Sequence, residues 1–426
     1  MSISTNRPAA AGFGNLDLHP DLVRGVEDAG FSEPRPIQSE TLPPALRGAD
    51  VLGLAQTGTG KTAAFALPLL HRLLSSSSAE PGPRALVLAP TRELASQIDA
   101  EIRLLARFTR LGTALIFGGA PIRGQVAALR RRPEIVVACP GRLLDLLSQR
   151  AVRLDRIETL VLDEADHMFD MGFLPSIRRI LAALPRKRQN LFFSATMPRE
   201  IRRLADEILV SPHVVTLSDQ KPAATIEHVL HPVPEARKRA LLDSILRSPE
   251  CTSAIVFTRT KRRTQRLAKD LDRDGHRAVG LQGNLSQGQR DRAMRGFRER
   301  RFDILVATDI AARGIDVSGV SHVINFDVPN TPEAYTHRIG RTGRSENAGR
   351  AATFVTADDW GWVRATERRL GAPIPRVELD RDAAPEAAPR KQPARARRAD
   401  AHEGGERRNA PVPRRRRRRR PARHAS

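Results

Sequence analysis

The sequence predicts an α/β protein with two tandem doubly wound domains, each built on a largely parallel β-sheet. Three observations support this fold class. Short apolar runs, bounded by glycine, proline or charge, alternate with longer helical patterns through most of the chain. Runs of this kind fit strands that are buried on both faces, with helices between them. The series occurs twice, and a polar interruption at residues 218–225 (SDQKPAAT) separates the two copies.

The strands are expected at the apolar runs. In the first series, after a strand at Val51–Leu54, they are predicted at Ala85–Ala89, Ala114–Phe117, Ile135–Ala138, Thr159–Leu162 and Asn190–Phe193. In the second series they are predicted at Ala254–Phe257, Asp303–Ala307, His322–Asn325 and Ala352–Thr356. The polar, turn-rich segment Ser75–Pro83 is expected to be a surface loop of the first domain.

These patterns divide the chain into four parts. The first domain is expected at residues 1–217, a linker at 218–225, the second domain at 226–375 and a tail at 376–426. From Arg381 to Ser426, sixteen Arg and Lys residues stand against five Asp and Glu, a net charge of +11. A segment rich in Pro, Ala and Arg cannot build a core, so the tail is expected to be disordered.

The composition restricts the possible partners. The formal net charge of +23 points to a polyanion, with nucleic acid as the first candidate and an anionic membrane surface as the second. Cys139 and Cys251 are too far apart for a disulfide framework or a zinc site. Because there is no signal peptide and no apolar run long enough to span a membrane, we expect a soluble cytoplasmic protein. Nothing suggests a dimerisation segment, so a monomer is expected.

A phosphate-binding loop follows the first strand. The sequence AQTGTGKT, with alanine in place of the usual first glycine, precedes a helix expected from Lys61 to about Leu74. Gly58 and Gly60 let successive backbone N–H groups point at phosphate oxygens, and the helix offers its positive N-terminal end to the same anion. Lys61 is expected to reach the β- and γ-phosphates and Thr62 to ligate Mg²⁺. The nucleotide-contacting residues are predicted to be Ala55, Gln56, Thr57, Gly58, Thr59, Gly60, Lys61 and Thr62.

Carboxylates follow another apolar strand about one hundred residues later, in the sequence LVLDEAD. The carboxyl end of a parallel strand faces the same crevice as the phosphate-binding loop. Asp163 is therefore predicted to hold the metal and Glu164 to deprotonate the attacking water. A solvated acidic turn is the alternative interpretation, and the ordered pairing with the loop argues against it.

The residues Asp163–Asp166 spell the motif that names the DEAD-box RNA helicases, and the chain resembles that family from residue 13 to about 365. The segment from Gly30 to Gln38 resembles its Q motif, with Phe13 as the upstream aromatic residue. The resemblance implies two RecA-like domains, ATP and Mg²⁺ as cofactors, adenine recognition by Gln38 and Phe31, and an ATP site that includes Phe13. The short, nearly bare core and the composition rich in Arg and Ala indicate a bacterial member. Arg35 stands where many members have threonine, and we expect this change to matter little.

Other motifs of the first domain resemble elements that grip the RNA backbone. The resemblance assigns RNA contacts to Pro90, Thr91, Arg92, Gly119 and Arg142. Cys139 stands where threonine is usual, and a thiol is a poor hydrogen-bond donor, so one contact is expected to be lost or made by the backbone. The resemblance also implies that Ser194, Thr196, Asp166 and His337 couple the ATP state to unwinding.

The motifs of the second domain resemble those of the family to different degrees. Residues 255–260 (IVFTRT) resemble the fourth motif, whereas Gln282-Gly283-Asn284 replaces the usual His-Gly-Asp. The resemblance assigns RNA contacts to Arg290 and Thr308 and an ATP contact to Asp316. Arg341 and Arg344 are predicted to project from one helical turn and to act as arginine fingers when the two domains close on ATP.

Three questions stay open at this stage. A DNA-directed helicase of the same superfamily is one alternative, and the Q motif argues against it. An ATP-dependent RNA clamp that unwinds little is another, because it would need the same residues. The seven arginines from Arg414 to Arg420 fit an RNA tether, a compositional extension without a role or, in a eukaryote, a nuclear localisation signal.

Overall fold

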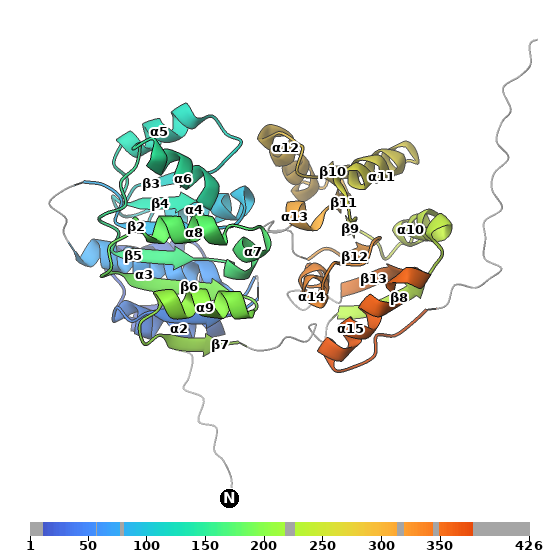
Figure 1. Ribbon diagram of the computed structural model, residues 1–426, viewed down its shortest axis with the longest axis horizontal. Coiled ribbons are helices and arrows are strands. Elements are labelled where there is room, and N and C mark those ends of the chain that lie inside the picture. Colours follow the sequence, from blue (N-terminus) through green and yellow to red (C-terminus); the bar gives the residue numbers. More distant parts are fainter. Residues whose placement is uncertain are drawn as a thin grey trace, which may run out of the picture. The chain divides into compact units, whose positions relative to one another are not determined.

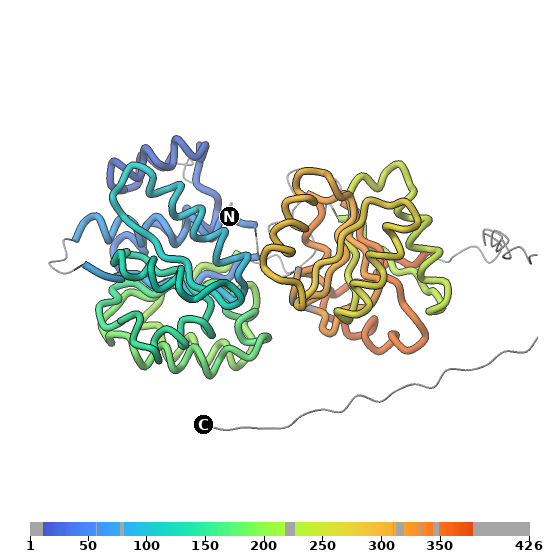
Figure 2. The backbone as a smooth tube through the Cα atoms, turned by 90° about the horizontal axis from the view of Figure 1, so that it is seen from above, coloured from blue at the N-terminus to red at the C-terminus, as the bar shows by residue number. Residues whose placement is uncertain are grey.

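The computed structural model describes residues 12–56, 58–76, 81–217, 226–312, 319–343 and 349–377 (Figure 1). The predicted linker and almost all of the predicted tail lie outside these residues. Two contiguous stretches of sequence each form one sheet with its helices (Figure 2). We call residues 12–217 the N-terminal lobe and residues 226–377 the C-terminal lobe.

The N-terminal lobe contains a seven-stranded parallel sheet in the order β3-β4-β2-β5-β6-β1-β7. This confirms the predicted α/β class. The strands are β1 (Val51–Leu54), β2 (Ala85–Leu88), β3 (Thr113–Ile116), β4 (Ile135–Ala138), β5 (Thr159–Leu162), β6 (Gln189–Ser194) and β7 (His213–Thr216).

Helices cover both faces of this sheet because its strands alternate their apolar side chains between two cores. Val87 points into a core shared with α1 to α4, whereas its neighbours Leu86 and Leu88 point into a core shared with α5 to α9. The helices are α1 (Pro20–Asp28), α2 (Pro36–Leu46), α3 (Lys61–Ser75), α4 (Arg92–Leu105), α5 (Ile122–Arg130), α6 (Pro140–Ser148), α7 (Ala165–Asp170), α8 (Leu174–Leu181) and α9 (Arg199–Ile208).

The C-terminal lobe repeats this design with six parallel strands in the order β10-β11-β9-β12-β13-β8. The strands are β8 (Ile226–Pro232), β9 (Ala254–Phe257), β10 (Ala278–Leu281), β11 (Ile304–Ala307), β12 (His322–Asn325) and β13 (Gly349–Val355). One core includes α12, α14 and α15, and the other includes α10 and α11. The helices are α10 (Lys238–Leu246), α11 (Lys261–Arg273), α12 (Gln287–Arg298), α13 (Asp309–Ala312), α14 (Pro332–Ile339) and α15 (Trp360–Leu370).

Three strands were missed by the sequence analysis, and each lies at the edge of a sheet: β7, β8 and β10. An edge strand is only partly covered, so polar residues interrupt the apolar runs of β7 and β8, whereas β10 is a short apolar run that includes Gly280. In β7 only Val215 is buried, and β8 contains Glu227 and two histidines. The predicted tail also begins slightly early, because Arg376 and Val377 pair with Leu230 of β8.

Within the part of the chain that the structure describes, no helix combines the length and the apolar character needed to cross a membrane.

Candidate nucleotide and RNA site

The predicted motifs of the N-terminal lobe lie along one edge of its sheet. Parallel strands place their carboxyl ends at the same edge, and loops at this edge bind ligands in open α/β sheets. Strands β5, β6 and β1 are adjacent and lead into Asp163, Ser194 and the phosphate-binding loop. Strands β3, β4 and β2 lead into the three predicted RNA-binding turns. Strand order therefore divides the edge into a nucleotide half and an RNA half.

Two glycines of the phosphate-binding loop adopt a left-handed backbone conformation. Gly58 and Gly60 have φ values of 87° and 93°, in the left-handed region that favours glycine. A Cβ atom on Gly60 would lie 2.6 Å from Nε2 of Gln38, so this position also excludes a larger residue. Helix α3 begins immediately afterwards at Lys61 and carries Thr62 in its first turn. Thr57 lies outside the described residues.

Lys61 is 95% buried and joins the loop to the acidic motif. Its Nζ donates a hydrogen bond to the carbonyl oxygen of Ala55 at 3.0 Å and lies 3.9 Å from Oδ1 of Asp163. The ammonium group is therefore held between the two elements that sequence analysis assigned to phosphate and metal.

Asp163 and Glu164 are both buried but differ electrostatically. Burial raises the pKa of Asp163 to about 6, and Lys61 only partly offsets that effect. Burial also favours the neutral form of Glu164, but His167, then Lys61 and Arg341, outweigh it and hold the pKa of Glu164 well below its usual range. Glu164 is therefore a carboxylate at neutral pH.

The donor set at this edge suits Mg²⁺. Asp163 is a buried carboxylate with incomplete charge compensation, and the Thr62 hydroxyl belongs to the first turn of α3, which follows the phosphate-binding loop. Among the described residues no group of three or more His, Cys, Asp or Glu side chains could hold a metal ion. Mg²⁺ commonly uses one or two protein ligands together with water and substrate phosphates, so this sparse set fits it better than a closed metal cage would.

Asp166 connects the acidic motif to the end of β6. Its Oδ2 accepts hydrogen bonds from the backbone N–H of Thr196 at 2.9 Å and from the Thr196 hydroxyl at 2.8 Å. The Asp166 backbone N–H donates to the Ser194 hydroxyl at 3.2 Å. All three predicted coupling residues of this lobe are thus brought together.

The Q-motif residues lie against the phosphate-binding loop. Gln38 is fully buried, and its Nε2 donates to the carbonyl oxygen of Gly60 at 3.0 Å while its Oε1 accepts from the Arg35 backbone at 2.8 Å. Arg35 also reaches the loop, because its Nη1 donates to the carbonyl oxygen of Gly58 at 3.0 Å. The expectation that Arg35 matters little did not foresee this contact.

The two predicted aromatic residues have different surroundings. Phe13 is buried in the core, and its ring meets that of Phe31 edge-on, with centroids 6.2 Å apart. Phe31 is only partly buried. Phe13 therefore supports Phe31 from behind, and Phe31 is the ring with an accessible surface.

The RNA half of the edge combines a helix N-terminus with two arginines. The Thr91 hydroxyl accepts from the Leu94 backbone and caps α4, whose N-terminal N–H groups favour an anion. Arg92 occupies the space that a side chain at Gly119 would need, with Nη1 only 2.1 Å from an ideal Cβ there. Arg142 donates to the carbonyl oxygen of Ala120 at 3.0 Å. Pro90 lies beside Thr91 at the end of β2 and is buried.

Cys139 is buried at the N-cap of α6, with no side-chain hydrogen bond to the helix. Burial raises the pKa of its thiol to about 12, so it remains a neutral thiol. This agrees with the expectation that it contributes no strong donor.

Arg290 of the C-terminal lobe has three protein partners. Its guanidinium group donates to the carbonyl oxygens of Gln282 and Ala311 and lies 2.6 Å from Oε1 of Glu93. Because these partners occupy its guanidinium group, Arg290 is better suited to position the neighbouring segments than to bind a phosphate. Thr308, at the carboxyl end of β11, is buried close to this group.

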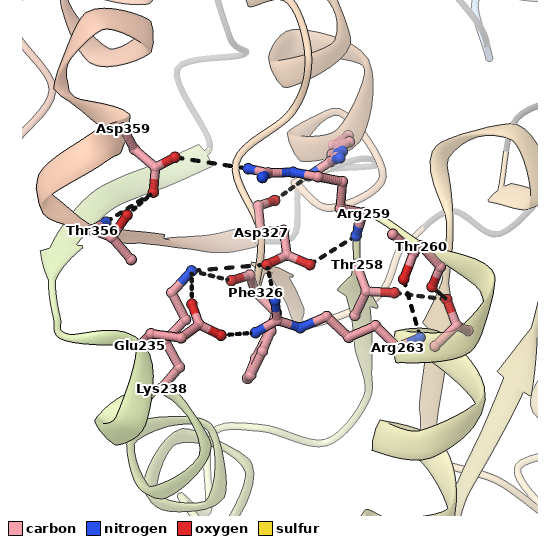
Figure 3. A network of polar contacts seen from close by, with 12 residues as sticks. Glu235, Lys238, Thr258, Arg259, Thr260, Arg263, Phe326, Asp327, Thr356 and Asp359 are labelled. Atoms are coloured by element: carbon pink, nitrogen blue, oxygen red, sulfur yellow. Dashed lines mark hydrogen bonds and ion pairs between the residues drawn. The ribbon is translucent and has the colours of Figure 1, made fainter.

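The fourth motif is held by a neutralised network at the ends of β9, β12 and β13 (Figure 3). Asp327 lies at its centre and is buried, with Arg263 Nη1 at 3.1 Å from Oδ1 and the Arg259 backbone N–H at 2.8 Å from Oδ2. Three cations face three carboxylates, so this network fixes the motif without attracting phosphate. The charged members are Lys238, Arg259, Arg263, Glu235, Asp327 and Asp359.

The sixth motif corrects one prediction. Helix α14 ends at Ile339, and Arg341 lies in the turn beyond it, not on a helical turn as expected. The glycine at position 340 caps the helix and ends the run. Arg341 is buried, whereas Arg344 and Asp316 lie outside the described residues.

Two residues of this region were not singled out from the sequence. Arg338 is buried and binds both carboxylate oxygens of Asp309, with Nη2 at 2.7 Å from Oδ2, so it ties the sixth motif to the fifth. His167 contacts Glu164 directly, and its ring lies 5.4 Å from that of His337. The three-residue spacing of Glu164 and His167 could have suggested their contact.

The fold and this edge define a nucleotide-dependent motor of two parallel-sheet lobes. Residues 35–204 match the family model described as DEAD/DEAH box helicase, and residues 237–346 match the helicase conserved C-terminal domain. The chain is 45% identical to the ATP-dependent RNA helicase CshA of Listeria monocytogenes over 83% of this chain and 68% of that protein. It is 44% identical to the DEAD-box ATP-dependent RNA helicase CshA of Bacillus subtilis, over 86% and 74%.

Solved structures agree. S. cerevisiae Dbp5 bound to RNA and ADP BeF3 matches with a TM-score of 0.79 and 32% identity, over 87% of this chain and 96% of that one. Mss116p bound to ssRNA and AMP-PNP matches with a TM-score of 0.80 and 26% identity, over 88% and 80%. The chain belongs to the DEAD-box family of ATP-dependent RNA helicases.

Proposed function

We propose that this chain hydrolyses ATP at the edge formed by β1, β5 and β6 and uses the cycle to bind, locally melt and release RNA. The observation that carries the proposal is the buried cluster of Lys61, Asp163 and Glu164 at the end of two strands that flank β6. Preorganised charges in a water-poor site are what phosphoryl transfer requires.

In the hydrolytic step, Glu164 takes a proton from water while the water oxygen bonds to the γ-phosphorus. The bond from that phosphorus to the bridging oxygen breaks, and its electron pair leaves with ADP. Lys61 stabilises the charge on the phosphate oxygens. Asp163 and Thr62 would hold Mg²⁺, which neutralises phosphate charge when bound. The proton leaves Glu164 with the departing phosphate or through water.

Adenine specificity is assigned to the Q motif. The amide of Gln38 is fixed by Arg35 and Gly60 but retains one donor and one acceptor position for a base edge. Phe31 supplies a ring face beside it, supported by Phe13. ATP is therefore preferred over GTP.

Arg341, together with Arg344, is proposed to supply positive charge to the γ-phosphate when the two lobes close. An arginine in this role contributes on the order of 10³–10⁵ in rate in related systems. Asp166, Thr196, Ser194 and His337 pass the ATP state to the RNA half of the edge. Since the RNA contacts are to the backbone, little sequence preference is expected.

The first experiment is steady-state ATP hydrolysis without nucleic acid, with single-stranded RNA and with single-stranded DNA, using Glu164→Gln as the blank. Strong stimulation by RNA alone supports the proposal. Equal stimulation by DNA would overturn the RNA preference and favour a DNA-directed enzyme. ATP hydrolysis by Glu164→Gln would show that another residue is the general base. Long-lived RNA binding with slow turnover would favour the clamp.

The basic tail is proposed to be an additional RNA tether. Residues 381–426 of this tail carry +11 of the net charge of +23, and arginine contacts to phosphate release counterions. A variant that ends at Val377 should bind RNA more weakly and with a shallower salt dependence, while ATP turnover at saturating RNA is retained. An unchanged salt slope would contradict the tether. We further propose that the protein acts as a monomer in the bacterial cytoplasm, since the two CshA relatives come from bacteria; sedimentation would test the monomer.

A further inference from the structure

A buried histidine binds the carboxylate that is proposed to deprotonate water. Nδ1 of His167 lies 2.7 Å from Oε2 of Glu164, and the two side chains are only 4% and 3% exposed. A charged hydrogen bond that is shielded from water is stronger than one at the surface. The contact therefore restricts the rotation of the Glu164 carboxylate.

The local backbone creates this contact. Glu164 has a φ of 52°, a left-handed conformation that is uncommon for a residue other than glycine, and it caps helix α7. The backbone N–H of Met168 closes the first turn on the Glu164 carbonyl at 3.1 Å. The side chains of Glu164 and His167, three positions apart, then lie on the same side of that turn. Strained conformations of this kind cluster at functional sites.

The proton in this hydrogen bond belongs to His167. A ring nitrogen and a carboxylate oxygen 2.7 Å apart share one hydrogen, and an ionised carboxylate can only accept a hydrogen bond. Nδ1 of His167 is therefore the donor. The other ring nitrogen, Nε2, is buried and has no hydrogen-bond partner among the described residues. An ordinary core position would satisfy both nitrogens, because an unmade buried hydrogen bond is costly.

Titratable groups from several elements lie near the pair of His167 and Glu164. Lys61 of α3 and Arg341, beyond α14, act electrostatically on Glu164. Asp166 is the neighbour of His167 in the acidic motif, and His337 of α14 forms an edge-to-face ring contact with His167 at 86°. The His167 backbone N–H also donates to Oδ1 of Asp166 at 3.1 Å. The imidazole thus lies between the proposed base and the residues proposed to couple ATP to RNA.

We propose that His167 is a positioning residue for ATP hydrolysis, whose Nδ1–H orients the Glu164 carboxylate toward the attacking water. This inference rests on the proposed role of Glu164. His167 itself touches neither ATP nor RNA, so its loss should slow the chemical step without weakening the binding of either.

Two amide variants separate this role from packing. The amide nitrogen of His167→Asn takes about the place of Nδ1 and can donate to Glu164, whereas that of His167→Gln lies nearer the place of Nε2. A leucine variant, His167→Leu, removes the donor and keeps a similar volume. The matched control is His276→Leu, because Nε2 of His276 lies 2.7 Å from Oδ1 of Asp243, a partly buried histidine–carboxylate pair away from the site.

The measurement is RNA-stimulated ATP hydrolysis by the full chain, with kcat and the KM values for ATP and RNA determined separately and melting temperatures recorded. His167→Leu and His167→Gln should lower kcat on the order of ten-fold, with both KM values nearly unchanged. His167→Asn should retain most of the wild-type kcat, and His276→Leu should match the wild type.

Equal losses in the asparagine and leucine variants would show a packing role and overturn the proposal, as would a wild-type kcat in all three His167 variants. Should the leucine variant melt below the assay temperature, the asparagine–glutamine comparison still decides the matter. Glu164→Gln tests the role of Glu164 as the base separately from the positioning role of His167. If that variant hydrolyses ATP normally, the base assignment itself fails; if it is inactive while the His167 variants are normal, only the positioning role fails.

Discussion

Arg35 donates a hydrogen bond from Nη1 to the carbonyl oxygen of Gly58, 3.0 Å away, and so joins the Q motif to the tip of the phosphate-binding loop. The side chain is exposed, and its Cδ atom would lie 3.0 Å from a Cβ atom on Gly60. A threonine at this position could not span that distance. The arginine therefore adds both a clamp on the loop and a positive charge near the triphosphate.

Arg35→Thr should raise the KM for ATP by roughly three- to ten-fold and change kcat little, because an exposed hydrogen bond from a charged group contributes about 1 kcal/mol. Fluorescent-nucleotide binding and steady-state kinetics would measure this. Arg131→Thr, at another exposed arginine of the same lobe, is the control. An unchanged KM would mean that Arg35 serves only the loop geometry seen in this structure.

Lys61→Ala should abolish ATP turnover, lowering kcat by at least about 10². The lysine is buried between the Ala55 carbonyl and Asp163, so its removal also leaves a buried carboxylate without its cation. Hydrolysis assays and thermal melts should both respond. Lys187→Ala, at an exposed lysine of this lobe, should affect neither. Normal turnover in Lys61→Ala would remove the phosphate assignment.

Thr196→Val should separate hydrolysis from unwinding. It removes the hydroxyl bond to Asp166 and leaves the backbone bond of Thr196 to the same oxygen. We expect RNA-stimulated ATP turnover within about three-fold of the wild type and duplex unwinding reduced on the order of ten-fold. A strand-displacement assay run beside the ATPase assay tests this, with the exposed Thr216→Val as control. Equal losses in both assays would argue against a coupling role.

Mg²⁺ affinity should fall with pH below neutrality. Burial raises the pKa of Asp163 to about 6 in the metal-free protein, so the carboxyl group binds a proton as the pH falls through this value. Mg²⁺ must then displace that proton, and its apparent affinity should decrease by up to about ten-fold per pH unit below 6. Mg²⁺ titrations of nucleotide binding at pH 5.5, 6.5 and 7.5 would reveal the slope. The same titrations with Asp163→Asn report the protonation of the nucleotide alone, and identical slopes would exclude Asp163 as the titrating group.

The interior strands were predictable because burial on both faces demands an uninterrupted apolar run. Ala85–Leu88 and Ile135–Ala138 illustrate this, and every residue of both strands is buried. The edge strands β7 and β8 were not predictable in this way, since their exposed side tolerates polar residues such as Glu227 and His228 of β8. The third, β10, is an apolar run of only four residues and is buried only at its two ends. The position of all three strands depends on pairing with strands far away in the sequence.

In the candidate site, too, some features were predictable from the sequence and others were not. The order of the motifs was sufficient to place Lys61, Asp163 and Glu164 at one sheet edge, because parallel strands share their carboxyl ends. The end of α14 at Ile339, which separates Arg341 from the helix, was not visible in the spacing of the arginines. The contacts of Arg290 with Gln282, Ala311 and Glu93 were also hidden, since they join segments distant in the chain.

The sequence by itself determined the family, the two parallel sheets and the candidate nucleotide-binding residues, because these depend on local apolar runs and on short motifs whose chemistry needs particular side chains. Only the tertiary structure decided which hydrogen-bond and ion-pair partners these side chains have. Three hydrogen bonds illustrate this: Arg35 to Gly58, His167 to Glu164 and Arg338 to Asp309. They form because strand order, helix ends and burial bring these residues together. Such contacts arise when the folded chain excludes water and brings distant groups within hydrogen-bonding distance, and residue spacing alone does not specify them.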